Sequence, residues 1–543
     1  MKYLLIYMSL FMVSPLLSQT DTSHTKLQLN QVEVIKTFEA NLEDAQNITI
    51  KSVLPTQKPF SPSYKYDITI VPLELKYPDP QIKPLAMNPD GPFKMNKGYL
   101  NVAYGVLQNP EITAGYHATK KDTYNAGIHI DITSLNNTKK IPFQKYSNIG
   151  LDLYGSYMIK ENMKLYGGIN GSSKIRYFYH TDLNVAENFN EQQSKRKLNT
   201  LDINAGISNA ERTKNEFNYN INLALNSLNL SNSDGRENGI IFKGHVEKHI
   251  GSATVFLLNA SFDHTAINAD TAISLITTRL TPWIKTKFGN LIVQLGVDYT
   301  YDGNSTSSFF PEVLLSFGVA GPNLQVFAGL RQQYYTNNFR NVTSLNPYLS
   351  TNITSIKNTI NQEYFAGLKG QFSFLNYQIK AGYKTISNQM LLLNTSNDKR
   401  YFDMLFDDVN VIYASGNLDF GITENVSFGG WLTQNVYDLK MITNAWHLPN
   451  IEANVYTKIS FLDSKLLFAG ELFFNDKVPF LNKDNVFEKS NILFDLNTSI
   501  VYKITDKISV VAKGINLLDN KFERWYGYPS VGINGLLGVS VLF

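Results

Sequence analysis

A two-residue alternation of apolar and polar side chains, kept from about Gly98 to Phe543, constrains this chain more than any other feature. The clearest run places Phe217, Tyr219, Ile221, Leu223 and Leu225 between Asn218, Asn220, Asn222, Ala224 and Asn226. Successive side chains of a β-strand point to opposite faces. Each run therefore predicts a strand with one apolar and one hydrophilic face, and the helical period is nearly absent from this region.

The number of such runs indicates the architecture. We count about 20 candidate strands, many of them separated by Gly-, Asn- or Asp-containing turns. A sheet of this size in water would need an apolar partner layer, whereas lipid supplies that layer if the sheet closes on itself. The sequence therefore predicts an all-β membrane protein, an antiparallel transmembrane β-barrel of about 22 strands within a range of about 14 to 22. Long loops are expected near residues 182–195, 336–359 and 438–450.

Composition agrees with a barrel and excludes other classes. Charged residues make up 17% and aromatic residues 13% of the chain, yet the mean hydropathy is only −0.19. The net charge of +3 is too small to indicate a nucleic-acid partner. The chain has no Cys, which excludes disulfides and thiolate metal sites.

The N-terminus resembles a secretory signal peptide. Lys2 precedes an apolar stretch over residues 3–17, and the small residue Ser18 precedes polar Gln19. The alternative is a membrane anchor, but the apolar stretch is shorter than the about 20 residues that a spanning helix needs. We therefore assign residues 1–18 to a signal peptide, and expect an exported protein of the cell outer membrane.

Residues 19–97 form a Pro-rich segment that holds nine of the 19 prolines. Proline lacks a backbone donor and fixes φ, so this segment cannot be a regular helix or a central strand. We expect an extended periplasmic or lumenal leader over residues 19–97, followed by the barrel over residues 98–543.

The last strand has the pattern of a barrel-assembly signal. Val539, Val541 and Phe543 share one face, and the chain stops on the aromatic residue. Such a strand would pair with the barrel-assembly machinery by β-augmentation during biogenesis.

The residues before it resemble the closing hairpin of TonB-dependent outer-membrane receptors. The similar residues are Asn516, Leu517, Leu518 and Asp519, then Tyr528, Pro529 and Gly532. Ile533 stands where that family usually has Arg. The resemblance implies a 22-stranded barrel of the Bacteroidota type, but residues 19–97 are too few for a full-length plug domain.

A short stretch near the N-terminus resembles the box through which these receptors pair with TonB. It comprises Gln31, Val32, Glu33, Val34, Ile35, Lys36 and Thr37. TonB is thus a candidate partner. A structural strand or a disordered tether is the alternative interpretation.

No catalytic, cofactor or metal motif is found. The eight histidines are scattered. His245 and His249 are four residues apart, about 13 Å along a strand, which is too far for one metal ion. We expect both on one face of the barrel wall, no metal, no cofactor and no enzyme activity.

Two functions remain open. The first is transport of a nutrient or other solute across the outer membrane. The alternative is a non-transporting barrel subunit of a larger secretion, barrel-assembly or lipoprotein-export complex, with the leader as a docking arm for other envelope proteins. The expected surroundings are outer-membrane lipid.

Overall fold

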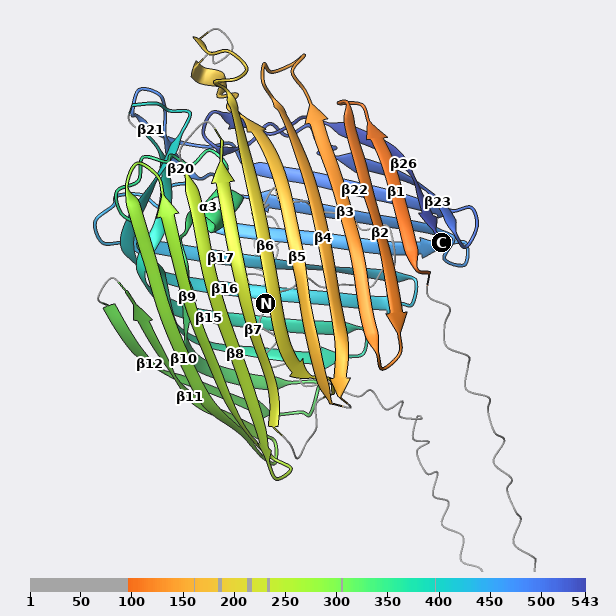
Figure 1. Cartoon of the computed structure of the whole chain (residues 1–543), viewed down its shortest axis with the longest axis vertical. Coiled ribbons are helices and arrows are strands. Elements are labelled where there is room, and N and C mark those ends of the chain that lie inside the picture. The colour runs from red at the N-terminus through yellow and green to blue at the C-terminus, as the bar shows by residue number, and fades with distance from the viewer. Residues whose placement is uncertain are drawn as a thin grey trace, which may run out of the picture. The chain divides into compact units, whose positions relative to one another are not determined.

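One closed antiparallel sheet dominates the computed structural model, which describes residues 96–160, 162–183, 188–211, 217–231, 235–303, 306–395 and 397–543. Figure 1 shows its strands in chain order around the barrel. The first half comprises β1 (Gly98–Gly105), β2 (Asn109–Lys120), β3 (Tyr124–Asn136), β4 (Lys145–Lys160), β5 (Met163–Tyr177), β6 (Lys195–Asn209), β7 (Phe217–Leu230), β8 (Arg236–Ile250), β9 (Thr254–Asn268), β10 (Ala272–Phe288) and β11 (Leu291–Asp302). The second half comprises β12 (Thr306–Gly318), β13 (Gln325–Tyr335), β14 (Thr359–Phe372), β15 (Leu375–Asn394), β16 (Phe402–Thr423), β17 (Val426–Leu439), β18 (Ile451–Phe461), β19 (Leu466–Asn475), β22 (Leu493–Lys503), β23 (Ile508–Ile515) and β26 (Asn534–Leu542).

These strands form a 22-stranded sheet in which each pairs with its neighbours in the chain. The sheet closes where β1 pairs antiparallel with β26, with Tyr99 opposite Leu542 and Gly105 opposite Leu536. Two backbone hydrogen bonds between Gly98 and Phe543, of 2.8 and 2.9 Å, extend this seam to the last residue. Closure leaves the sheet without edges there, and the predicted barrel of 22 antiparallel strands is confirmed.

The two faces of the wall differ as the alternation predicts. On β6, Leu201 and Ile203 are 46% and 41% exposed on the exterior, while Asp202 and Asn204 point inward. Leu223 and Leu225 of β7 repeat the pattern. An apolar exterior of this kind is stable only against lipid, and a closed barrel satisfies its backbone hydrogen bonds internally.

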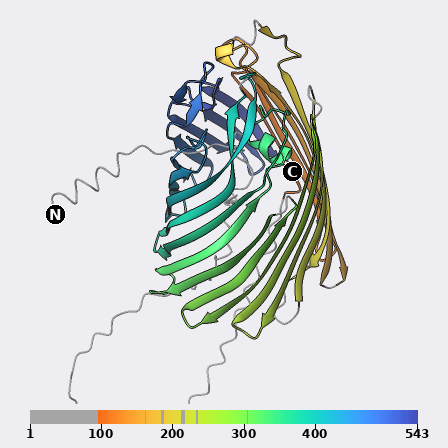
Figure 2. The same cartoon turned by 90° about the vertical axis from the view of Figure 1, so that its left-hand side faces the viewer.

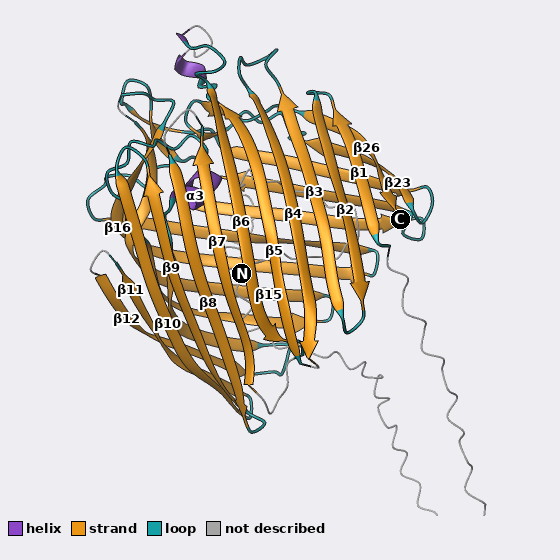
Figure 3. Cartoon of the chain, in the orientation of Figure 1, coloured by secondary structure: helices purple, strands orange, loops and turns teal. Residues whose placement is uncertain are grey.

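The remaining elements lie at the end of the barrel opposite the chain end at Phe543. They are η1 (Thr181–Leu183), α3 (Phe339–Leu345), and two small sheets, β20 (Pro479–Leu481) with β21 (Phe487–Lys489) and β24 (Glu523–Trp525) with β25 (Tyr528–Pro529). Figure 3 shows how strongly strands dominate over helices. We call this end the outer end, and the end at Gly98 and Phe543 the terminal end.

Loop length separates the two ends. Neighbouring strands at the terminal end are joined by short turns, such as residues 289–290, 373–374 and 424–425. The long predicted loops all lie at the outer end, where the structure describes residues 178–183, 188–194, 336–358 and 440–450 between strands. Long outer loops and short inner turns are typical of outer-membrane barrels.

In the described part of the chain, no helix is long and apolar enough to cross a membrane. The predicted signal peptide, the Pro-rich leader up to residue 95 and the TonB-box-like stretch from Gln31 to Thr37 lie outside the described residues, so they stay predictions.

Candidate functional site: a lid over the outer end of the barrel

Loops of the outer end fold inward and build a buried apolar core of their own. We call these segments the lid: residues 178–183, 336–358, 397–401, 440–450 and 516–533. Side chains of the lid pack on inward-facing residues of the wall, and Figure 2 shows α3 inside the barrel rim. The buried cluster comprises Phe178, Phe339, Val342, Tyr348, Leu349, Ile353, Ile356, Trp525 and Tyr528 with Leu198, Leu228, Leu230, Ile267, Leu275, Leu392 and Phe402.

Helix α3 anchors one side of the lid to the wall. It begins at Asn338, whose side chain accepts a hydrogen bond of 2.9 Å from the backbone N–H of Asn341, a standard N-cap. The Arg340 guanidinium forms a bidentate ion pair with Asp202 of β6. The backbone N–H of Arg340 also donates to Glu237 of β8 over 3.1 Å. Loop 336–358 is therefore held to two strands far from its own.

Two tyrosines join loop 336–358 to loop 516–533. The rings of Tyr348 and Tyr528 stack with centroids 3.6 Å apart and planes 11° from parallel. The Tyr528 hydroxyl donates to the Arg400 carbonyl over 2.6 Å. Tyr179 lies edge-on to Tyr528 at 5.1 Å. Three loops thus meet at one aromatic contact.

Arg196 of β6 binds loop 336–358 from the barrel wall. It is 2% exposed, and its Nη1 donates to the carbonyl oxygens of Pro347 and Leu349 over 3.0 and 2.5 Å. Its guanidinium lies 5.0 Å from the ring centroid of Phe178. A cation held by carbonyl oxygens and an aromatic face fixes loop 336–358 in its inward position.

Two buried histidines contact aromatic residues of the β24–β25 hairpin. His180 packs against Tyr526 and Tyr528, and His447 packs against Phe402 and Trp525. Gly527, at φ +80°, lets the turn approach His180 so closely that a Cβ atom would overlap the imidazole. Burial lowers the pKa of His180 to about 4 and, with the charge of Arg524, that of His447 to about 3. Both imidazoles are therefore neutral at neutral pH.

A cavity of about 370 Å³ lies between the lid and the wall. Tyr348, Trp525 and Tyr528 of the lid line it on one side, and strands β2 to β5, β22, β23 and β26 on the other. Its charged lining comprises Lys145, Arg176, Lys513, Arg524, Glu111 and Asp495. Aromatic faces next to charged groups can hold a polar solute.

Charged groups of the inner wall form hydrogen-bonded clusters across strands. Glu363 of β14 is 2% exposed and accepts from Arg331 Nε, Lys380 Nζ and the Tyr413 hydroxyl over 2.7, 2.8 and 2.5 Å. Lys513 of β23 donates to Glu111 of β2 over 2.7 Å. The interior is thus hydrophilic, and hydrogen bonds join its charged side chains across strands. A polar interior is typical of outer-membrane barrels.

The receptor-like residues near the C-terminus divide between two places. Asn516 donates to the carbonyl oxygens of Asn520 and Val531 over 3.0 and 2.9 Å, and Asp519 accepts from the Ile533 N–H over 3.1 Å. These bonds close the neck of loop 516–533, and Gly532 leaves room there for the Asp519 carboxylate.

The other members of that set lie elsewhere in the same loop. Tyr528 lies in the buried core of the lid, and the neighbouring Pro529 carbonyl accepts from Gln144 Nε2 over 2.9 Å. Leu517 and Leu518 are exposed. The set therefore connects barrel closure to the lid, a link that sequence alone did not indicate.

The assembly-signal residues form the closing seam. Val539 and Phe543 are exposed on the exterior, and Val541 pairs with Leu100 of β1. The missing side chain at Gly98 lets the Phe543 ring lie over the seam. Their role in assembly stays a prediction. His245 and His249 lie on one face of β8, as predicted, with Glu247 between them.

No family model and no curated protein matches this sequence. Solved structures do match in fold. The FrpB iron transporter from Neisseria meningitidis is 9% identical, with a TM-score of 0.66 over 83% of this chain and 82% of that chain. The ferripyoverdine receptor of the Pseudomonas aeruginosa outer membrane is 12% identical, with a TM-score of 0.61 over 84% and 72%. The siderophore receptor PirA from Acinetobacter baumannii is 9% identical, with a TM-score of 0.63 over 83% and 80%.

These similarities show the fold, a large closed antiparallel β-barrel. Together with the closed sheet and its apolar exterior, they identify an outer-membrane β-barrel. The predicted localisation is therefore confirmed.

Proposed function

We propose that this chain transports a nutrient or other solute across the outer membrane, with the lid as its gate. The observation that carries the proposal is the lid itself. A buried apolar core spans loops from both sides of the outer rim, above an interior lined by charged and amide side chains. Loops that fold over a polar interior in this way can close it at rest and admit a solute when they move.

Two further observations support a solute pathway. The cavity beside the lid offers aromatic faces and charges of both signs to a bound molecule. The structures of similar fold are named as an iron transporter and as siderophore receptors, which are transport proteins and not enzymes. The chain would accordingly have no enzyme activity.

We also propose how the N-terminal part contributes. Residues 1–18 would be removed as a signal peptide, and the Pro-rich residues 19–97 would form an extended periplasmic or lumenal leader without a full-length plug, in a receptor of the Bacteroidota type. The stretch from Gln31 to Thr37 would add a strand to TonB and transmit energy for opening. Deleting it should then abolish uptake while the barrel still inserts.

Planar-bilayer recordings of the full-length protein test the pathway. A variant in which residues 338–357 are replaced by a short Gly-Ser linker should conduct ions steadily, whereas the unaltered protein should be mostly closed. Replacing the terminal-end turn 462–465 by a linker is the matched control and should change nothing. If neither form conducts and the chain purifies with other envelope proteins, it is a subunit of a larger complex and the transport proposal fails.

A further inference from the structure

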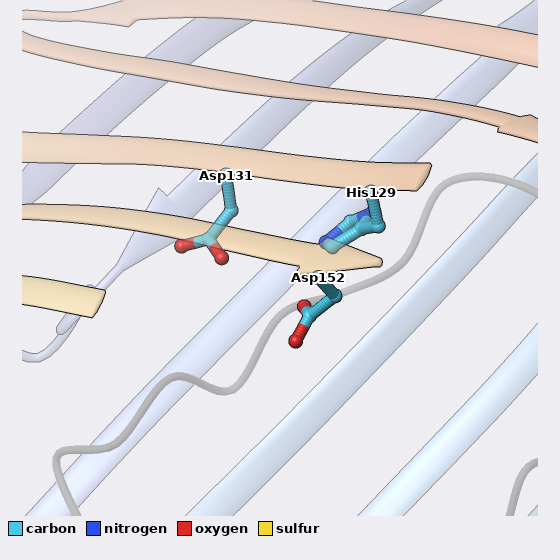
Figure 4. A group of neighbouring side chains, drawn as sticks. All are labelled: His129, Asp131 and Asp152. Carbon is cyan, nitrogen blue, oxygen red and sulfur yellow. The ribbon is translucent and has the colours of Figure 1, made fainter. Parts of the chain in front are cut away.

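Three metal-binding side chains converge on the inner wall, near the middle of β3 and β4 and away from the lid. His129 and Asp131 are two residues apart on β3 and so share its inward face. The strand register places Asp152 of β4 directly opposite His129, and Gly150 opposite Asp131. Figure 4 shows the imidazole and both carboxylates lying next to one another on these two strands. One ligand atom from each residue lies within 4.8 Å of the other two.

Glycine makes this approach possible. A Cβ atom at residue 150 would overlap Oδ1 of Asp131, so Gly150 lets that carboxylate lie across β4 toward Asp152. Adjacent carboxylates on neighbouring strands repel each other. A bound cation would reverse the sign of that interaction, since it attracts both groups at once.

Neighbouring strands orient two of the three side chains. The Tyr99 hydroxyl of β1 lies 2.5 Å from Nδ1 of His129, and Asn170 of β5 donates to Oδ1 of Asp152. A metal-binding imidazole usually bonds a neighbour through its second nitrogen, and a metal-binding carboxylate is usually hydrogen-bonded as well. Because Tyr99 bonds Nδ1, Nε2 is the nitrogen that would coordinate the metal ion.

The geometry points to a site for one divalent first-row transition metal ion, bound by His129, Asp131 and Asp152. One imidazole nitrogen and two carboxylate oxygens suit Mn²⁺, Fe²⁺ or Zn²⁺. Bonds of about 2.1 Å place ligand atoms at most about 4 Å apart, so small side-chain rotations complete the site. Three protein ligands leave further positions open to water or another ligand from the lumen.

This inference does not depend on transport, because a wall site binds metal whether or not the barrel conducts. Sequence gave no sign of it, since His129 and Asp131 alone are too few ligands. Asp152 lies 21 positions after Asp131 in the chain, and only the pairing of β3 with β4 places it opposite His129. Among the described residues, His245 and His249 are not part of such a three-ligand group. Their Nε2 atoms lie 3.7 and 2.7 Å from the carboxylate oxygens of Glu247.

Metal binding by the full-length, untagged protein in detergent tests the inference. After removal of metals with EDTA, the protein is titrated with Co²⁺ by optical absorption and with Mn²⁺ by electron paramagnetic resonance. We expect one ion per chain. Asp131→Asn and Asp152→Asn, which keep side-chain shape, should each weaken binding by at least about 10-fold, and Tyr99→Phe by about 10-fold.

Glu247→Gln is the matched control, because it removes an inner-wall carboxylate beside two histidines and should leave the affinity unchanged. Heat-modifiable migration in gel electrophoresis confirms that each variant is folded. Unaltered affinity in the Asp131→Asn/Asp152→Asn double variant, loss of binding in Glu247→Gln, or no binding at millimolar metal would each overturn the inference.

Discussion

The two ends of the barrel join neighbouring strands differently. At the terminal end, turns such as 289–290 and 424–425 reverse the chain with almost no additional structure. At the outer end, loops 336–358 and 516–533 turn inward and bury tyrosines, a tryptophan and isoleucines against the wall. The terminal end only closes the sheet, whereas the outer end folds a second core.

The difference shows that two separate forces shape this chain. Contact with lipid stabilises apolar side chains on the exterior of the strands, and this holds at both ends of the barrel. The lid has no lipid to satisfy its apolar residues, so Phe339, Leu349 and Ile356 are buried only if the loops fold into the mouth. Changes at the outer end should therefore alter gating without unfolding the barrel, and changes at the terminal end should do the reverse.

Tyr528→Ala should have the largest effect on the lid. It removes a buried ring that stacks on Tyr348, and aromatic truncation in a core costs about 3–5 kcal/mol. Hydrogen-exchange mass spectrometry should show fast exchange across loops 336–358 and 516–533. Tyr502→Ala, on the exterior near the terminal end, is the control and should leave lid exchange as it was. If both variants increased exchange in these loops equally, the outer and terminal ends would not differ in their effect on the lid.

Arg340→Met should come next. It keeps the aliphatic stem and leaves the Asp202 carboxylate without its guanidinium, and breaking a partly buried ion pair in this way costs about 1–3 kcal/mol. Exchange should rise most within α3. Adding Asp202→Asn should recover part of the loss, because the remaining charge is then gone. No recovery in the double variant would mean that the pair does not anchor the lid.

Acid should loosen the lid. The pKa values of His180 and His447 fall from the ordinary 6.5 to about 4 and about 3 in the closed lid, so the open lid binds more protons. The stability contributed by the neutral imidazoles is complete above pH 6.5 and is lost progressively as the pH falls toward these lower values. Lid exchange should accelerate between pH 6.5 and 4, after correction for intrinsic exchange.

His447→Leu should flatten that pH response, because it removes one of the two protonation sites. His117→Leu changes a half-buried inner-wall imidazole near the terminal end and should not flatten it. A pH response that is identical in both variants would count against the buried histidines.

Gly289→Ala should have the smallest effect. Gly289 has φ +57°, and a Cβ atom there would meet nothing within 4 Å, so only backbone strain of about 1 kcal/mol is added. The barrel should melt at slightly lower temperature with unchanged lid exchange. Gly171→Ala, also without neighbours for a Cβ but in a strand, is the control. A change in lid exchange would show that the ends are coupled.

Most of the barrel could be predicted from sequence. The alternation at Phe217 to Asn226 predicted β7 and its exterior face, and repetition of that pattern predicted about 20 strands, close to the 22 of the structure. Period two identifies the face of each residue but not its partner on the next strand. For that reason the meeting of His129 with Asp152 could not be foreseen.

The lid was missed for a related reason. Sequence placed loops near residues 336–359 and 438–450 but gave no direction for them. A signal was present, because Phe339, Val342, Leu349, Ile353 and Ile356 are too many large apolar residues for a loop in water. Their burial depends on contacts with Leu198, Leu228 and Trp525, which lie far away in the chain.

Cysteine labelling tests most directly whether the lid closes a pathway. The chain has no Cys, so Ser172→Cys places one thiol on the inner wall of β5. In intact cells, a bulky membrane-impermeant maleimide should label this thiol slowly, and rapidly once Tyr528→Ala is added. Asn188→Cys, on an exposed outer loop, should label rapidly in both backgrounds. Equally rapid labelling of Ser172→Cys with and without Tyr528→Ala would contradict a closed lid over a solute pathway.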